Sequence, residues 1–240
     1  MSSVRSTPVA GAPSKPSKGR RGGKAASGST GKQAATSNPP SSRAERALER
    51  RQAIIEAALD EFIARGFTAT RLDDIARRAG VAKGTIYLHF KDKESMFEEL
   101  IRTALVPLIS RLHAPPPSGG SVRDAVEGFA RTFIQEVAAT RRGDIVRLIV
   151  AEGPRFPAIA DFYYREVVSR GLAGMRALIE LGIDRGEIAN QDLARFPQIL
   201  VAPALIAVIW QSLFAKHAPL DVTEMLRVHL DLIFGERRTA

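Results

Sequence analysis

The chain has 240 residues, of which 45% are hydrophobic, so it can build one large domain or two modest ones around a substantial core. It contains no cysteine, which excludes disulfides and thiolate metal sites and fits a reducing cytoplasm. The formal net charge of +9 suggests a nucleic-acid partner, but most of that charge lies in one segment. No apolar stretch reaches the roughly 18 residues that a membrane-spanning helix needs, so we expect a soluble, cytoplasmic protein without a membrane partner.

Residues 1–43 carry this excess charge. They hold eight Lys or Arg and no acid, which leaves 27 basic against 26 acidic residues in the rest of the chain. Ser, Gly, Ala and Pro dominate the segment, and large apolar side chains are too few to offset the entropy of ordering it. We predict a disordered basic tail that lacks the apolar stretch of a secretory signal. A role along DNA phosphates and a plain solvated extension both remain open.

Helical periodicity begins at Ala44. Leu48, Ile55, Leu59 and Phe62 recur at helical spacing and predict an amphipathic helix of about 20 residues that ends at Gly66. Thr70 is expected to cap a second, short helix that Gly80 ends. A third helix is expected to follow as far as Phe90, and Asp92 is expected to cap a fourth.

Three short helices with a Gly turn between the second and third have the layout of a helix-turn-helix unit. The second and third are too short to be stable alone, so the first must supply an apolar wall for them. The residues expected to face that wall are Leu72, Ile75, Ala76, Val81, Ile86 and Phe90. The residues left facing outward on the third helix are Lys83, Gly84, Thr85, Tyr87, Leu88 and His89.

This outward set suits the major groove of DNA. Gly84 allows close approach, Thr85 can meet a base edge or a thymine methyl group, and Lys83 can reach a guanine or a phosphate. Tyr87, His89 and Lys93 are donors at the rim of the groove, where phosphate oxygens lie. The segment is therefore predicted to bind double-stranded DNA.

Residues 45–100 resemble the DNA-binding domain of the TetR/AcrR family of transcriptional regulators. The match runs through Gly66-Phe67, Thr70, Asp74-Ile75-Ala76, Ala79-Gly80-Val81, Lys83-Gly84-Thr85-Ile86-Tyr87, His89-Phe90 and Lys93-Glu94. The resemblance implies a homodimer whose two helix-turn-helix units bind successive major grooves of a near-palindromic operator. It also implies that the C-terminal helices bind a small effector that loosens DNA binding, and that the protein is a repressor.

The resemblance further implies DNA contacts at particular positions. By position these are Thr70, Lys83, Thr85, Tyr87, His89 and Lys93, with Arg71 opening the helix that lies over the DNA backbone. The chain departs from the family at Ala82, where Ser or Thr usually caps the third helix. The missing cap should cost about 1 kcal/mol of helix stability.

The rest of the chain also has helical patterning. The fourth helix carries an apolar stripe from Phe97 to Leu112, and Pro107 inside it predicts a kink. After the break "APPPSGG", helical segments are predicted near 121–139, 143–152, 157–185, 192–216 and 221–235. The fold class is therefore all-α, with a helix-turn-helix domain at 44–93 and a helical effector-binding and dimerisation domain at 94–240.

The segment "ILVAPALIAVIW", residues 199–210, is apolar all round and must be covered on every side. Together with a stripe formed by Met225, Leu226, Leu230 and Ile233, it is a candidate two-fold interface, and a fully internal helix is the alternative. Candidate effector-binding residues, each of which is also compatible with plain core, are Phe129, Phe133, Tyr163, Met175 and Trp210. Few charges interrupt these faces, which favours an apolar or weakly polar ligand.

Other classes of function are less compatible with the sequence. None of the four His residues has Glu three positions before it, as the di-metal sites of helix bundles require, and no Gly-rich phosphate loop follows a strand. We therefore expect no metal, no cofactor and no enzymatic activity. The remaining alternative is a sequence-tolerant DNA-compacting protein led by the basic tail, which would bind any duplex with similar affinity.

Overall fold

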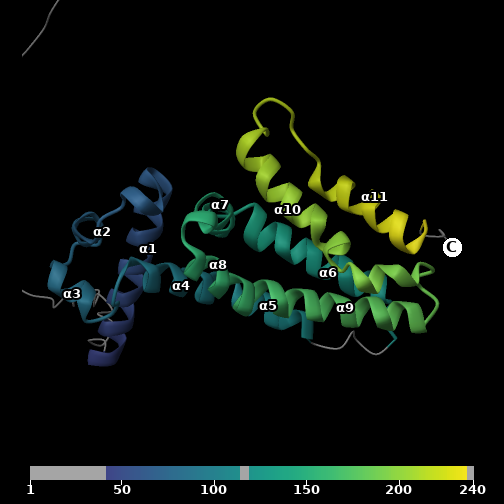
Figure 1. The fold of residues 1–240 in the computed structure, drawn as a ribbon, viewed down its shortest axis with the longest axis horizontal. Helices are drawn as coiled ribbons and strands as arrows, with labels where there is room; N and C mark the ends of the chain where they lie inside the picture. The colour runs from purple at the N-terminus through teal and green to yellow at the C-terminus, as the bar shows by residue number, and fades with distance from the viewer. Residues whose placement is uncertain (1–41, 114–118, 237–240) are drawn as a thin grey trace, which may run out of the picture. The chain divides into compact units, whose positions relative to one another are not determined.

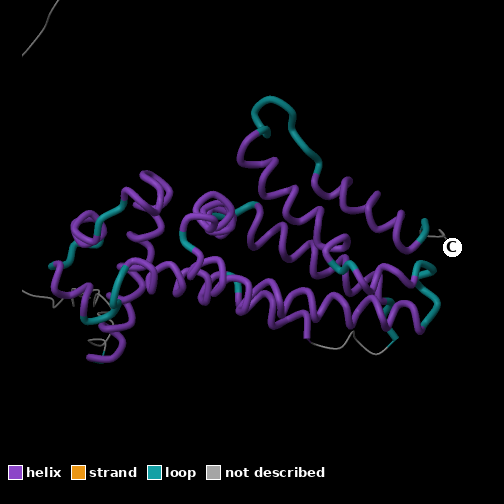
Figure 2. Tube along the Cα trace, in the orientation of Figure 1, coloured by secondary structure: helices purple, strands orange, loops and turns teal. Residues whose placement is uncertain are grey.

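The computed structural model describes residues 42–113 and 119–236, which belong to one compact unit that begins at Ser41. Within these residues every regular element is a helix, which confirms the all-α prediction (Figure 2). The predicted tail lies outside the described residues except for its last two positions. Arg43, which was assigned to the tail, is instead the first residue of a helix.

Four helices form the N-terminal part of the described chain (Figure 1): α1 (Arg43–Ala69), α2 (Leu72–Arg78), α3 (Lys83–Tyr87) and α4 (Lys93–Ala104). α1 starts early because Ser42 and Glu45 form a capping box that satisfies free backbone N–H groups at the helix start. Near its other end, α1 is kinked at Gly66, whose φ is +76°. Glycine adopts this positive φ without steric cost.

The core of this part lies where α1, α2, α3 and α4 meet. Phe62, Phe67 and Phe97 pack with ring centroids 5.1 to 5.6 Å apart, and all three are buried. Ile75 from α2 and Ile86 from α3 have no exposed surface. The residues predicted to face the first helix therefore do so, with Leu72 and Val81 partly buried at the edge of the cluster. Leu48 does not belong to it, because its side chain is exposed on α1.

The turn between α2 and α3 matches its prediction. Gly80 has φ of +67°, and the Val81 N–H donates to the Ala76 carbonyl at 3.0 Å, which closes the end of α2. No side-chain cap precedes α3, as expected for Ala82, and α3 itself ends at Tyr87 rather than at Phe90. Asp92 caps α4 and forms a capping box with Ser95.

The C-terminal helices surround a second core cluster. Their bounds are α5 (Val106–Ser110), η1 (Arg111–His113), α6 (Val122–Phe133), η2 (Ile134–Ala138), α7 (Arg142–Glu152), η3 (Gly153–Arg155), α8 (Pro157–Tyr163), η4 (Tyr164–Val168), α9 (Ser169–Asp184), η5 (Gln191–Arg195), α10 (Gln198–Leu213) and α11 (Val222–Phe234). Because η2 and η4 are π-helical turns, α6 runs on through η2, and α8 runs through η4 into α9, as the long predicted segments require. The predicted segment 192–216 is divided before Gln198.

Pro107 marks a break rather than a bend in one helix. α4 ends at Ala104, the linking residue Leu105 has φ of −110°, and Pro107 lies in the first turn of α5. Proline fits there because the first turn of a helix leaves its N–H groups without partners. α5 then leads directly into the C-terminal helices.

Candidate functional site

The short helix α3 turns one face to the core and the other to solvent. Ile86 is fully buried, whereas the side chains of Tyr87 and Leu88 are 54% and 82% exposed. Lys83 and Gly84 are exposed as well, and Thr85 and His89 are partly exposed. The outward set that the sequence predicts is therefore accessible.

Ion pairs between α1 and α2 hold this face in place. Glu61 on α1 is buried and pairs with Arg78 at 2.7 Å and with Arg65 at 3.2 Å. Arg65 also lies 3.3 Å from Asp74, whose pKa is held below its ordinary value mainly by a hydrogen bond from Arg77. The short second helix is thereby fixed against the long first one, which sets the position of α3.

Lys83 leans back towards α2 instead of extending freely. Its Nζ atom lies 2.8 Å from Asp73 Oδ1, and the hydrogen bond that Lys83 donates to this carboxylate raises the pKa of Lys83. Both side chains are about half exposed, and ion pairs in such positions contribute little to stability. Lys83 can therefore exchange Asp73 for a nucleic-acid acceptor at small cost.

Thr70 is placed differently from its prediction. It does not cap α2, since the residue before that helix is Arg71, which makes no side-chain cap hydrogen bond. The side chain of Thr70 is 2% exposed, and its hydroxyl donates to the carbonyls of Gly66 at 2.8 Å and Glu61 at 3.0 Å. The predicted cap is wrong. The predicted contact with DNA stays a prediction, and this burial favours a structural role instead.

The ammonium group of Lys93 is fixed at the start of α4. Its Nζ atom donates to the carbonyls of Phe67 at 2.8 Å and Thr68 at 3.2 Å, and it lies 4.6 Å from the centre of the Phe67 ring. These carbonyls end α1 and have no partner within that helix. Lys93 thus links α4 to the end of α1 and holds a positive charge there. Arg71 is exposed between α1 and α2.

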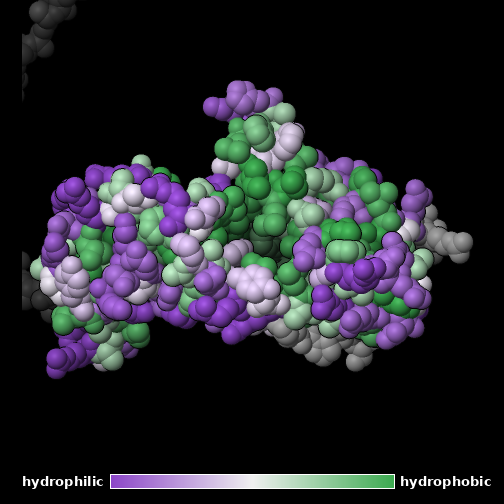
Figure 3. Space-filling view, viewed as in Figure 1, coloured by the Kyte–Doolittle hydropathy of each residue, from purple (hydrophilic) through white to green (hydrophobic). Residues whose placement is uncertain are grey.

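A cavity of about 180 Å³ lies among the C-terminal helices. Figure 3 shows a hydrophobic hollow in this part of the surface, beneath α10. The wall is built by α5, α6, α8, α9, α10 and α11 together with η1, η2 and η4. Four of the five predicted effector residues line it: Phe129, Phe133, Tyr163 and Met175. Trp210 does not, because it lies further along α10, where its indole donates to the Ala218 carbonyl at 2.7 Å.

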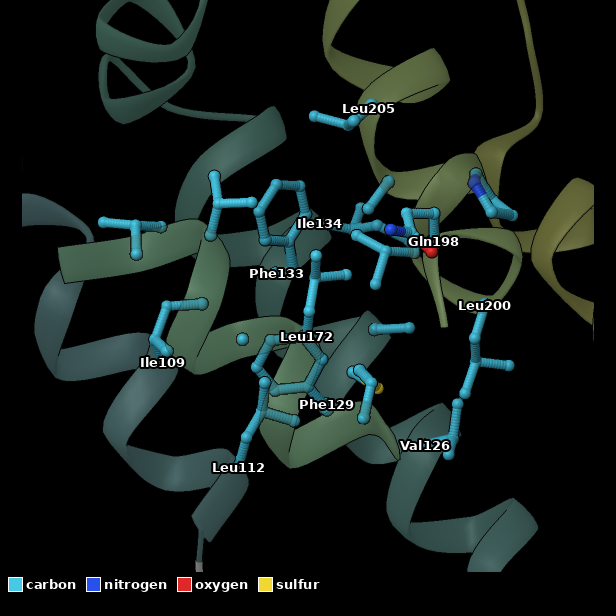
Figure 4. A pocket seen from close by; sticks show the side chains of 18 of the residues that line it. Ile109, Leu112, Val126, Phe129, Phe133, Ile134, Leu172, Gln198, Leu200 and Leu205 are labelled. Carbon is cyan, nitrogen blue, oxygen red and sulfur yellow. The ribbon is translucent and has the colours of Figure 1, made fainter. Parts of the chain in front are cut away.

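Several wall residues were not singled out from the sequence. Ile109, Leu112 and Val126 come from α5, η1 and α6, and Gln198, Leu200 and Leu205 come from α10 (Figure 4). Leu112 belongs to the predicted apolar stripe of the fourth helix, and Ile109 was not part of that stripe. Leu200 and Leu205 lie in the segment 199–210, the candidate two-fold interface, and α10 in fact presents one side to the cavity. Gly171 also lines the cavity, and Gly174 allows close contact with Leu112.

The C-terminal helices pack against the helix-turn-helix part through a shared hydrophobic core, in which α7 contacts α1 and both α7 and α8 contact α4. The ring of Phe156, just before α8, packs edge-on against Phe67 with a centroid distance of 4.6 Å. The guanidinium of Arg102 on α4 lies 5.1 Å from the ring centre of Phe162 on α8. Asp60 on α1 also pairs with Arg141. The same short helix, α8, therefore contacts α4 and contributes Tyr163 to the cavity.

One side of the α10 and α11 pair is rich in exposed apolar side chains. The most exposed members are Ile199, Ile206, Leu213, Val228 and Leu232, the last at 81%. The described helices include none that combines the length and hydrophobicity of a membrane span. The described residues also contain no group of three or more His, Cys, Asp or Glu side chains that could hold a metal ion.

An accessible helix-turn-helix face joined to a helical bundle with an internal cavity defines the class of helix-turn-helix transcriptional regulators. Comparison with known families agrees. The family described as bacterial regulatory proteins, tetR family, matches residues 54–100, and the one described as tetracyclin repressor-like, C-terminal domain, matches residues 116–229.

Individual relatives point the same way. The uncharacterized HTH-type transcriptional regulator YhgD of Bacillus subtilis (strain 168) is 44% identical over 178 residues, which is 72% of this chain and 89% of YhgD. The HTH-type transcriptional repressor BepR of Brucella suis biovar 1 (strain 1330) is 33% identical over 166 residues, 65% of this chain and 77% of BepR. The solved SmeT–triclosan complex has the same fold, with a TM-score of 0.65 at 19% identity over 77% of this chain and 89% of that one.

The chain belongs to the TetR family of bacterial regulatory proteins. It is a transcription regulator with a DNA-binding helix-turn-helix domain, and it is not an enzyme.

Proposed function

We propose that the protein is a repressor that binds a near-palindromic operator as a homodimer in the cytoplasm and is released by a small, mainly apolar effector. The observation that carries the DNA-binding part is the accessible outer face of α3, where Tyr87 and Leu88 are exposed next to Lys83. The matching proteins are named as regulators, and BepR is named as a repressor. We therefore propose that this chain, when bound to its operator, represses transcription.

The contacts divide by what each side chain can reach. Lys83, Gly84 and Thr85 begin α3 and would meet base edges, because the start of a recognition helix enters the groove. The residues that would meet the DNA backbone are Arg71, Tyr87, His89 and Lys93. Backbone contacts set the register of the protein on the duplex, and the base contacts select the sequence.

A second copy of the chain is the partner that best fits the apolar side of α10 and α11. Figure 3 shows hydrophobic residues gathered over α10. Leu232 and Leu213 are more than half exposed there, and burying such side chains in a two-fold interface removes apolar surface from water. Two copies also supply the two reading helices that a near-palindromic operator needs.

Release by an effector would use the contacts between the cavity and the helix-turn-helix part. Ile109 on α5 and Tyr163 on α8 both line the cavity. α5 follows directly from α4, and α8 touches α4 through the pair of Arg102 and Phe162. A ligand that moves these helices would change the spacing of about 34 Å that successive major grooves require.

The decisive experiment is selection of bound fragments from the parent genome, followed by competition with random DNA. We expect a specific site that binds about 10³-fold more tightly than random duplex at physiological salt. Equal affinity for both would overturn the operator proposal and favour a sequence-tolerant, DNA-compacting protein. Sedimentation of the complex then gives the number of protein chains on each site.

A further inference from the structure

The wall of the cavity is almost entirely hydrocarbon. None of the described side chains that line it carries a charge. Figure 4 shows Gln198 among Phe133, Ile134 and Leu200, and among the described wall residues the only other polar side chain is that of Tyr163. Both polar groups are neutral, so the described wall offers no counter-ion to a charged ligand.

The two polar groups differ in their surroundings. Gln198 begins α10 and is exposed, so water can satisfy its amide. Tyr163 is half-buried, and its hydroxyl makes no hydrogen bond to another described residue. Burial raises the pKa of Tyr163, which keeps the hydroxyl protonated at neutral pH. A half-buried hydroxyl that lines an apolar cavity and has no partner among the described residues gains more from a ligand hydrogen bond than an exposed amide does.

A charged ligand would lose its hydration in this cavity. An ion moved from water into an apolar site without a partner is strongly disfavoured, whereas a neutral hydroxyl group can recover its lost hydrogen bond from one neutral donor or acceptor. The wall therefore selects ligands mainly by their charge, and only then by the hydrogen bonds that they can form.

We propose that the cavity takes an electrically neutral molecule that is hydrocarbon over most of its surface and carries one hydroxyl group, which hydrogen-bonds the hydroxyl of Tyr163. Carboxylates and ammonium ions of the same size are rejected. This assignment rests on the proposed effector function of the cavity.

Four probes with one shared skeleton test the assignment: 4-propylphenol, propylbenzene, 4-propylbenzoate and 4-propylbenzylammonium. Each is titrated into the full chain at pH 7 by calorimetry. We expect the phenol to bind most tightly and propylbenzene to bind about 2- to 10-fold more weakly, which corresponds to one hydrogen bond. The two ions should bind at least about 100-fold more weakly than the phenol, since neither finds a counter-charge.

Two neighbouring tyrosines provide a matched pair of variants. Tyr163→Phe should reduce the affinity for the phenol to that for propylbenzene and leave propylbenzene binding unchanged. Tyr164→Phe should change neither, because Tyr164 is exposed and lies outside the cavity wall. An unchanged ratio of phenol to propylbenzene affinity in Tyr163→Phe would overturn the role of that hydroxyl.

The remaining outcomes also decide the matter. Binding of either ion as tightly as the phenol overturns the preference for neutral ligands, and failure of all four probes to bind overturns the assignment as a whole. Operator binding is measured on the same preparations. If the unmodified chain binds specific DNA but none of the probes, only the ligand class is refuted. If the unmodified chain does not bind specific DNA, the proposed function itself is refuted.

Discussion

The buried hydroxyl of Thr70 offers a sharp test of whether this residue acts on DNA or on the fold. Thr70→Val keeps the shape of the side chain and removes its hydrogen bonds to the carbonyls of Gly66 and Glu61. A hydroxyl has one proton, so the two distances describe one shared hydrogen bond, worth about 0.5 to 1.5 kcal/mol. Leaving a carbonyl without that partner in a site that is 2% exposed adds to the loss, and we expect about 1 to 2 kcal/mol in total.

Chemical denaturation followed by circular dichroism measures this loss, and competition titration measures operator affinity on the same protein. We expect reduced stability together with an unchanged affinity of the folded protein for its operator. Thr70→Ser is the control, because it keeps the hydroxyl and should retain most of the stability. If Thr70→Val kept full stability and bound the operator ten times more weakly or worse, the hydroxyl would be a DNA contact and our structural interpretation would fail.

Four further predictions follow from the same contacts. Lys93→Met should lower the slope of log affinity against log salt by about 0.9 for specific and random DNA alike, whereas Thr85→Ala should change the preference among operator variants; an unchanged slope would show that Lys93 contacts no phosphate. Leu232→Glu places a charge on the proposed interface and should yield a folded monomer in analytical ultracentrifugation, and a persistent dimer would place the interface elsewhere. Phe156→Ala removes the ring that packs on Phe67 and should weaken release by a bound probe in a gel-shift assay more than it weakens operator binding; full release would exclude this contact from the mechanism. Because burial lowers the pKa of His229, the unfolded chain takes up a proton first as pH falls below about 6.5, so stability should fall between pH 7 and 5; His229→Gln should show a smaller fall in denaturant titrations, and an equal fall would assign the effect to other groups.

The helix-turn-helix part was predictable because its determinants are local. Ile75 and Ile86 fall on the buried faces that helical periodicity assigns them, and Gly80 adopts the positive φ that its place between two short helices requires. Asp92 and Ser95 form a capping box that short-range spacing can indicate. In each case the relevant partners lie within a few residues along the chain.

Thr70 and Leu48 show where such local information ends. Thr70 stands near the start of a helix, yet α2 begins one residue later than a Thr70 cap needs, and the hydroxyl serves the preceding helix instead. Leu48 has the spacing of a core residue, but it lies on a part of α1 where its side chain is exposed. Both outcomes depend on how far the neighbouring helices extend. The apolar periodicity of one segment carries no information about the length of its neighbours.

The apolar helix α10 shows the same limit at the functional site. A helix without a polar stripe must be covered on more than one side, so the sequence correctly indicates two contacting surfaces. It does not show which residue faces which surface, because η2 and α7, which pack against α10 and lie far away in the sequence, set the rotation of α10 about its axis. In the structure Leu200 turns towards the cavity, Ile206 is exposed, and Trp210 lies past the end of the wall. A helix that forms a cavity wall on one side and an exposed apolar surface on the other gives bound ligand a direct route to the proposed interface between two copies.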